Sequence, residues 1–74
     1  MATKSAIKAA YIAALQATYA FYTEGSRPLA LANEAADSAL SGKMKLKGAC
    51  WDVALKANGL RPSITLRELA ELPE

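Results

Sequence analysis

Large hydrophobic side chains recur at helical spacing through the first third of the chain. They form a stripe whose members lie four, four, four and three residues apart: Ile7, Tyr11, Leu15, Tyr19 and Tyr22. This interval places side chains on one face of an α-helix, and neither Gly nor Pro interrupts the segment. The pattern therefore predicts an amphipathic helix over residues 4–24 with an aromatic-rich face, ended by a C-cap at Gly25.

Two further helices are expected in the middle of the chain. Ser26 as a cap and Pro28 in the first turn mark the start of a helix over 27–41, and Gly42 marks its end. Its expected inward stripe consists of Leu29, Ala32, Ala36 and Leu40. The next helix is predicted over 46–58. Its main apolar face would hold Leu46, Cys50, Val53 and Ala57, widened by Trp51, Ala54 and Leu55.

The clearest local signal lies near the end of the chain. Thr65 followed three residues later by Glu68 is the pattern of a capping box, in which each side chain bonds the other residue's backbone N–H. Ile64 before the cap and Leu69 after it form the hydrophobic pair that often accompanies such a box. The signal predicts a helix over 65–72. The four segments together predict an all-α fold, a small bundle of four helices joined by short loops.

Composition limits the stability of this fold. A chain of 74 residues makes one domain, residues 1–74, and buries about 60% of the surface that its unfolded form exposes. Alanine accounts for 17 residues and buries little area, so we expect a thin core. Cys50 is the only cysteine, so no disulfide can staple the chain, and self-association is one remaining way to add stability. A lone cysteine also fits a reducing compartment, and we expect a cytoplasmic protein.

The sequence holds no recognisable catalytic constellation. The chain has no His, so it lacks the commonest general base and the His partner that activates a Ser or Cys nucleophile. Its carboxylates are scattered, and its glycines lie at predicted helix ends rather than in a phosphate-binding loop. We therefore predict that the protein is not an enzyme and holds neither a metal ion nor an organic cofactor.

A basic cluster lies in the second half of the chain. It consists of Lys43, Lys45, Lys47, Lys56 and Arg61, which together with Asp52 give a local charge of +4. Such a cluster can contact phosphates, although Lys43 and Lys56 also suit helix C-termini, where cations offset the helix dipole. A helix-turn-helix is not supported, because acids on the last helix would repel phosphates beside a groove. Contact with the nucleic-acid backbone remains as a hypothesis.

Aromatic side chains supply the second candidate surface. Tyr11, Tyr19 and Tyr22 lie on the predicted first helix together with Phe21, and Trp51 is the only tryptophan. Amphipathic rings of this kind are enriched at protein interfaces. They could instead fill the protein's own core, yet four aromatic residues are many for a helix that packs against Ala-rich neighbours. Trp51 stands between the two interpretations, as a core residue or as an interfacial one.

These observations favour a non-catalytic interaction protein. We expect it to dock a helical surface on a protein partner as a modulator or inhibitor, or to assemble with copies of itself. The expected apolar anchors are Tyr11, Tyr19, Tyr22 and Trp51, with the lysines providing electrostatic steering. A phage or mobile-element accessory protein would have this size and composition. The alternative is a sequence-nonspecific binder of the nucleic-acid backbone; a membrane is not an expected partner, because the first helix lacks cations along its polar face.

Overall fold

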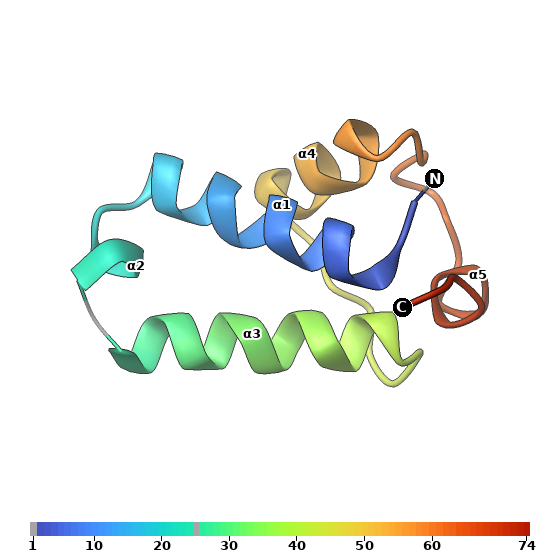
Figure 1. Cartoon of the computed structure of the whole chain (residues 1–74), viewed down its shortest axis with the longest axis horizontal. Helices are drawn as coiled ribbons and strands as arrows, with labels where there is room; N and C mark the ends of the chain where they lie inside the picture. The colour runs from blue at the N-terminus through green and yellow to red at the C-terminus, as the bar shows by residue number, and fades with distance from the viewer. Residues whose placement is uncertain (1, 25) are drawn as a thin grey trace.

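The computed structural model describes residues 2–24 and 26–74 and confirms the all-α prediction. In chain order, the helices are α1 (Lys4–Thr18), α2 (Phe21–Glu24), α3 (Ser26–Leu40), α4 (Ala49–Ala57) and α5 (Leu66–Ala70). α1 lies between α3 and α4 and contacts both (Figure 1). The described part of the chain contains no strand. α1, α3 and α4 therefore form the body of the fold, and the short helices α2 and α5 lie at its opposite ends (Figure 1).

The first helix ends at Thr18 rather than at residue 24. The Thr18 hydroxyl donates a hydrogen bond to the Ala14 carbonyl oxygen at 2.8 Å, and Tyr19 then adopts an extended backbone with φ −130° and ψ 117°. Hydroxyl bonds of this kind bend helices, and residues 18–23 are rich in aromatic and β-branched types that favour helix weakly. The break turns α2 towards α3, which it contacts. Tyr19 and Tyr22 consequently leave the stripe predicted for the first helix.

The two middle helices lie close to their predictions. α3 matches the predicted 27–41 segment to within a residue at each end, whereas the predicted caps, Gly25 and the side chain of Ser26, lie outside the described residues. α4 begins later than the predicted Leu46, because Gly48 adopts φ 128° as its N-cap, a conformation that residues other than glycine rarely adopt. Leu46 therefore lies in the connector, where it still packs against the core.

The capping box predicted for the last helix is present. The Glu68 backbone N–H donates to Thr65 Oγ1 at 3.1 Å, and the Thr65 backbone N–H donates to Glu68 Oε1 at 3.1 Å. The helix ends at Ala70, before the predicted residue 72. Leu69 is buried, and Leu72 packs against the core from beyond the helix. Local sequence therefore determines where α5 begins, whereas packing holds the segment that follows it.

One cluster of buried side chains joins four of the helices. It consists of Ile7, Ala36, Ala39, Leu40, Trp51, Ala54, Leu55 and Leu69. The alanines among them are fully buried, and their small size lets neighbouring helices approach α1 closely. Only Ile7 and Leu55 are both large and fully buried among the described residues. The core is therefore thin, and its stability depends on a few large side chains.

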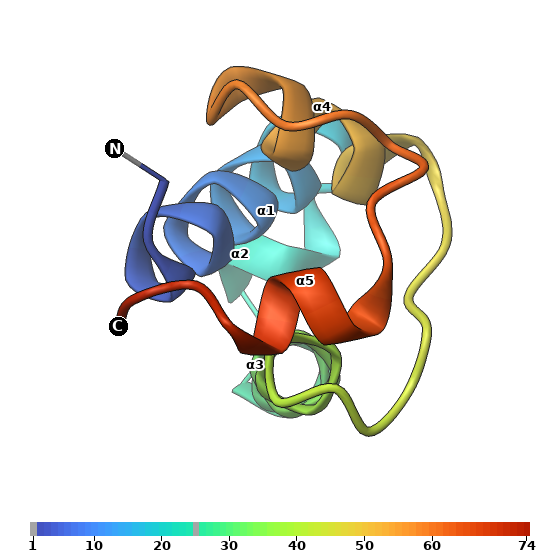
Figure 2. The same ribbon diagram turned by 90° about the vertical axis from the view of Figure 1, so that its right-hand side faces the viewer.

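Residues 73 and 74 lie beside the first turn of α1 (Figure 2). The Lys4 N–H donates to the Pro73 carbonyl oxygen at 2.8 Å, and the Ser5 N–H and hydroxyl donate to the Glu74 main-chain oxygen at 3.1 and 2.7 Å. The Lys4 ammonium also pairs with the Glu74 carboxylate at 3.9 Å. These contacts satisfy N–H groups that the start of a helix leaves without partners. We call this region, residues 3–8 with 72–74, the tied end.

Candidate docking site

Three aromatic rings gather where α1 gives way to α2. The ring centroids of Phe21 and Tyr22 lie 4.4 Å apart, and that of Tyr19 lies 5.6 Å from Phe21 and 6.0 Å from Tyr22. Tyr19 is 46% exposed and Phe21 is 52% exposed. Phe21 was not among the predicted anchors, and it joins Tyr19 and Tyr22 because the helix break regroups the three residues. We call these three residues the aromatic end.

Tyr11 and Trp51 occupy the interior of the neighbouring region. Their rings meet edge to face, with centroids 5.2 Å apart and an interplanar angle of 87°. Trp51 is only 3% exposed, so it belongs to the core. Burial raises the pKa of the Tyr11 hydroxyl, and Tyr22 and Cys50 add to the effect. All four predicted anchors line a hollow of the surface: Tyr11, Tyr19 and the buried Trp51 line one, and Tyr22 lines a second together with Tyr11.

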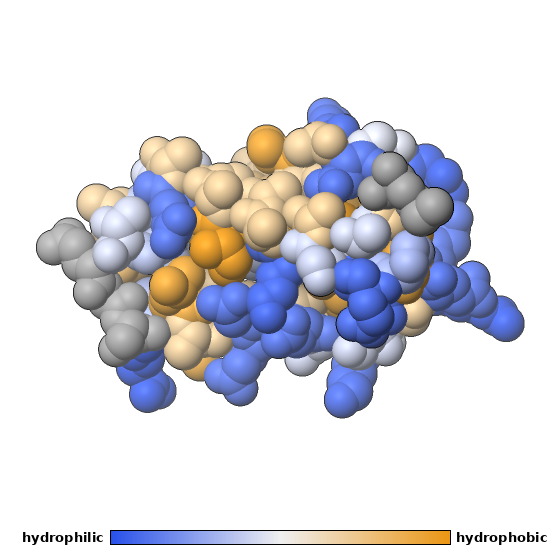
Figure 3. Space-filling model, in the orientation of Figure 1, coloured by the Kyte–Doolittle hydropathy of each residue, from blue (hydrophilic) through white to orange (hydrophobic). Residues whose placement is uncertain are grey.

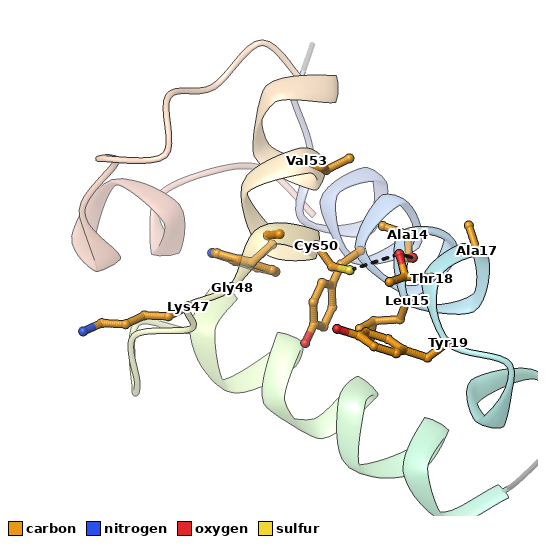
Figure 4. Close-up of a pocket in the computed structure, with 12 residues that line it drawn as sticks. Ala14, Leu15, Ala17, Thr18, Tyr19, Lys47, Gly48, Cys50 and Val53 are labelled. Carbon is orange, nitrogen blue, oxygen red and sulfur yellow. Dashed lines mark hydrogen bonds between the residues drawn. The ribbon is translucent and has the colours of Figure 1, made fainter.

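A groove of about 440 Å³ runs between the C-terminal half of α1 and the first turns of α4 (Figure 4). We call it the α1–α4 groove. It is bounded by Ala14, Ala17, Thr18 and Tyr19 on one side and by Ala49, Cys50 and Val53 on the other. The Cys50 thiol donates to the Thr18 hydroxyl at 3.7 Å, and Figure 4 shows this contact bridging the two helices. Most of the lining is apolar, so the groove suits apolar side chains of a ligand.

α4 presents apolar side chains on two faces. Trp51, Ala54 and Leu55 are buried in the core, whereas Val53 is 55% exposed and Ala57 is also exposed. Val53 and Ala57, which the sequence placed on the main apolar face, therefore do not mark the inward face of α4. Apolar residues surround most of this helix, so their periodicity does not identify its inward face. Figure 3 shows a continuous hydrophobic area over α1 and α4. Exposed apolar areas of this kind are typical of interaction sites.

The members of the predicted basic cluster differ in whether they form ion pairs. Four members are exposed: Lys43, Lys45, Lys47 and Lys56. These four enter none of the ion pairs formed within residues 2–24 and 26–74. Arg61 differs, because its guanidinium pairs with Glu68 at 3.3 Å. Three of the four lie in residues 41–48, which we call the lysine connector; Figure 2 shows it as a loop on the outside of the molecule.

Lys47 links the lysine connector to the α1–α4 groove. Lys47 and Gly48 line the groove at the start of α4. Figure 4 shows the Lys47 ammonium directed away from the groove interior, towards solvent. The charge therefore sits at the rim, where the aliphatic part of a lysine side chain can pack against apolar surface while its ammonium stays hydrated.

Within residues 2–24 and 26–74, no group of three His, Cys, Asp or Glu side chains is placed to hold a metal ion. None of the described helices is long and apolar enough to cross a membrane. No protein-family model matches the chain, and neither the curated proteins nor the solved structures give a match. The α1–α4 groove, the aromatic end and the exposed lysines are the described features that bear on function.

Proposed function

We propose that this protein is a non-catalytic interaction module that binds a protein partner through the α1–α4 groove and the aromatic end. The observation that carries the proposal is the apolar groove, which is open to solvent. Although the core is thin, Tyr19, Phe21 and Val53 remain about half exposed. Such side chains lose contact with water when a partner covers them, which favours association. Binding of this kind would let the protein modulate or inhibit its partner.

The exposed side chains set the scale of the affinity. Complete burial of one large apolar side chain is worth about 1.5–3 kcal/mol. Covering the exposed half of Tyr19, Phe21 and Val53 would therefore supply about 2–4 kcal/mol in total. A dissociation constant of about 1 μM corresponds to a net free energy of about 8 kcal/mol. The three side chains alone are insufficient, so contacts around the groove must contribute to tight binding.

A second copy of the chain is one partner that the same surface could bind. An isologous dimer would cover the groove of each protomer with the same patch of the other. Sedimentation equilibrium of the wild type and of Val53→Arg distinguishes this case. A dimer that Val53→Arg converts to monomers identifies a second copy as the partner, whereas a wild-type monomer indicates a different protein.

A nucleic-acid binder is the second candidate, and one observation favours it. Four exposed lysines enter no ion pair among the described residues, so they can contact phosphates. On duplex DNA each phosphate contact contributes a slope of about −0.9 to the dependence of log K on log salt. Four contacts therefore predict a slope of about −3 to −4. Arg61, the fifth member of the predicted cluster, would have to exchange its pairing with Glu68 for a phosphate contact.

Affinity capture from an extract of the source cell tests the main proposal. Val53→Arg places a cation in the groove, and Ser63→Arg is the matched control at an exposed position outside the groove lining. We expect nuclease-treated extract at moderate salt to yield a protein that the wild type and Ser63→Arg retain and Val53→Arg loses. Equal retention by all three chains would contradict the proposal. Recovery that nuclease abolishes would favour the lysines and phosphate binding.

A further inference from the structure

We infer that the occupant of the α1–α4 groove is an acidic segment of a protein partner, with an apolar side chain in the groove and carboxylates beside the lysine connector. The inference rests on the proposed function and adds the chemistry of the partner. Its basis is that an apolar groove shares an edge with a basic segment whose lysines form no ion pair among the described residues. Lys47 and Gly48 belong to both features.

The charges of the chain are distributed unevenly. Four cations elsewhere are matched with acids, in the pairs Lys4–Glu74, Lys8–Asp37, Arg61–Glu68 and Arg67–Glu71. Residues 43–56 hold four lysines and a single acid, Asp52, which give this segment a net charge of +3. The whole chain has a net charge of +2, so its positive charge is concentrated in this segment, whose Lys47 lines the groove. An acidic partner complements this charge, and opposite charges steer association.

The interior of the groove favours an apolar side chain over a nucleobase. Lys47 is the only charged residue in its described lining. The Thr18 hydroxyl and the Cys50 thiol already bond to each other, so few donors and acceptors remain for the polar edge of a base. A buried polar group without a partner is costly, whereas a Leu or Phe side chain has no polar edge to satisfy. A peptide is therefore a better occupant than a nucleic acid.

The start of α4 adds charge of the same sign as the lysines. Gly48 caps the helix, and no side chain among the described residues accepts a hydrogen bond at this cap. Ala49 and Cys50 belong to the first turn and line the groove. The N-terminal end of a helix carries a partial positive charge, which Asp52 in the same turn partly offsets. A partner carboxylate beside Lys47 would thus be attracted both by the ammonium and by the helix end.

Selection from a display library of short random peptides on the full-length chain tests the chemistry of the occupant. We expect the enriched peptides to combine a large apolar residue with an excess of Asp and Glu. Enrichment of apolar peptides without an acidic excess would overturn the inference while leaving the proposed function intact. Enrichment of no peptide, or of peptides that bind Val53→Arg as well as the wild type, would contradict both.

Matched charge reversals then locate the carboxylates. Lys47→Glu reverses a cation at the edge of the groove, and Arg67→Glu reverses an exposed cation on α5 by the same amount. With the strongest selected peptide as a fluorescent probe, we expect Lys47→Glu to weaken binding about tenfold. Arg67→Glu should change it by less than about twofold. Equal losses would indicate attraction to the net charge alone and would overturn the inference. Circular dichroism checks that both variants remain helical.

Oligothymidylate, added as a competitor in the same assay, tests whether a nucleic acid rather than an acidic peptide binds at this site. We expect the oligonucleotide not to displace the selected peptide at moderate salt, because it places no apolar side chain in the groove. Displacement at moderate salt that Lys47→Glu abolishes would overturn the inference in favour of nucleic acid.

Discussion

The two ends of α1 differ in how completely the rest of the chain buries their side chains and bonds to their backbone. At the tied end, Ile7 is fully buried, and the N–H groups of Lys4 and Ser5 bond to the segment that follows α5. At the other end, Tyr19 and Phe21 stay about half exposed, and their rings gather with that of Tyr22. One helix therefore contributes stability at its start and an uncovered apolar surface at its end.

This difference indicates where function can lie in so small a protein. A residue whose contacts are complete within the chain gains little from a partner, whereas a half-exposed apolar residue gains when it is covered. The α1–α4 groove includes Tyr19 and the exposed Val53. It lies at the C-terminal end of α1, where apolar side chains remain exposed to solvent. The comparison therefore predicts that substitutions at the tied end reduce stability, and that those at the groove reduce binding.

The largest expected effect is that of Ile7→Ala at the tied end. Removal of this fully buried side chain leaves a cavity, and we expect a loss of about 2–5 kcal/mol in the free energy of unfolding. Phe21→Ala, at the aromatic end, should cost about 1 kcal/mol or less, because half of the ring is already exposed. Urea denaturation followed by Trp51 fluorescence measures both. Equal losses would remove the distinction between the two ends.

Deletion of residues 73 and 74 should have the next largest effect. It removes the carbonyl acceptors of the Lys4 and Ser5 N–H groups, and each such hydrogen bond is worth about 0.5–1.5 kcal/mol. Glu74→Gln is the matched control, because it keeps the backbone bonds and removes only the exposed ion pair with Lys4. We expect the control to cost at most about 0.5 kcal/mol. If the deletion lowers the free energy of unfolding no more than the control does, the backbone bonds of residues 73 and 74 do not stabilise the start of α1.

Thr65→Ala should remove the cap of α5 at a cost of about 1 kcal/mol. The Thr65 hydroxyl accepts the Glu68 N–H, and no other side chain of the capping box can replace it. Thr65→Ser keeps the hydroxyl and should retain most of the stability. Thermal unfolding of the three chains compares them. If serine and alanine destabilise equally, the hydroxyl bond is not what stabilises α5.

Acid should weaken the same capping box. Hydrogen bonds from the Thr65 backbone and hydroxyl, aided by Arg61, lower the pKa of Glu68 below its usual 4.5. A carboxyl whose pKa is lowered in the folded state stabilises it above its unfolded pKa, and that contribution disappears as the pH falls through the folded value. We therefore expect the stability advantage of wild type over Glu68→Gln to shrink below about pH 4.5. Denaturation curves across the acid range test this; a constant difference would contradict it.

Alkali should produce the smallest effect, at Tyr11 between the two ends. Burial raises the pKa of this hydroxyl above its usual 10.0, with smaller contributions from Tyr22 and Cys50. The unfolded chain then releases the proton at lower pH than the folded chain, so stability is lost as the pH rises above about 10. We expect Tyr11→Phe to lose less stability than the wild type over this range. Parallel loss in both chains would assign the alkaline effect to other groups.

Local signals in the sequence predicted part of this structure. The capping box at Thr65 and Glu68 and the start of α3 depend on residues close together in the chain, and both lie within a residue of their predicted positions. The break before Tyr19 was not predicted, because no Gly or Pro marks it and the aromatic and β-branched types in residues 18–23 disfavour a helix only weakly.

The α1–α4 groove could not be predicted from the sequence pattern either. α4 is apolar around most of its circumference, so its periodicity did not show that Trp51 faces the core and Val53 faces solvent. The pairing of Arg61 with Glu68 likewise depends on how the chain turns between α4 and α5. Tyr19 was predicted as an anchor and does line the groove, although its role in binding remains a prediction.

The most direct test of the docking account uses the single cysteine, which lines the groove. We would measure the rate at which a thiol reagent labels Cys50, with and without a saturating acidic peptide from the display selection. We expect the peptide to slow labelling of Cys50 in the wild type and to leave the labelling rate of Val53→Arg unchanged. An unchanged rate in the wild type, under conditions in which the peptide is bound, would place the peptide elsewhere and contradict the account.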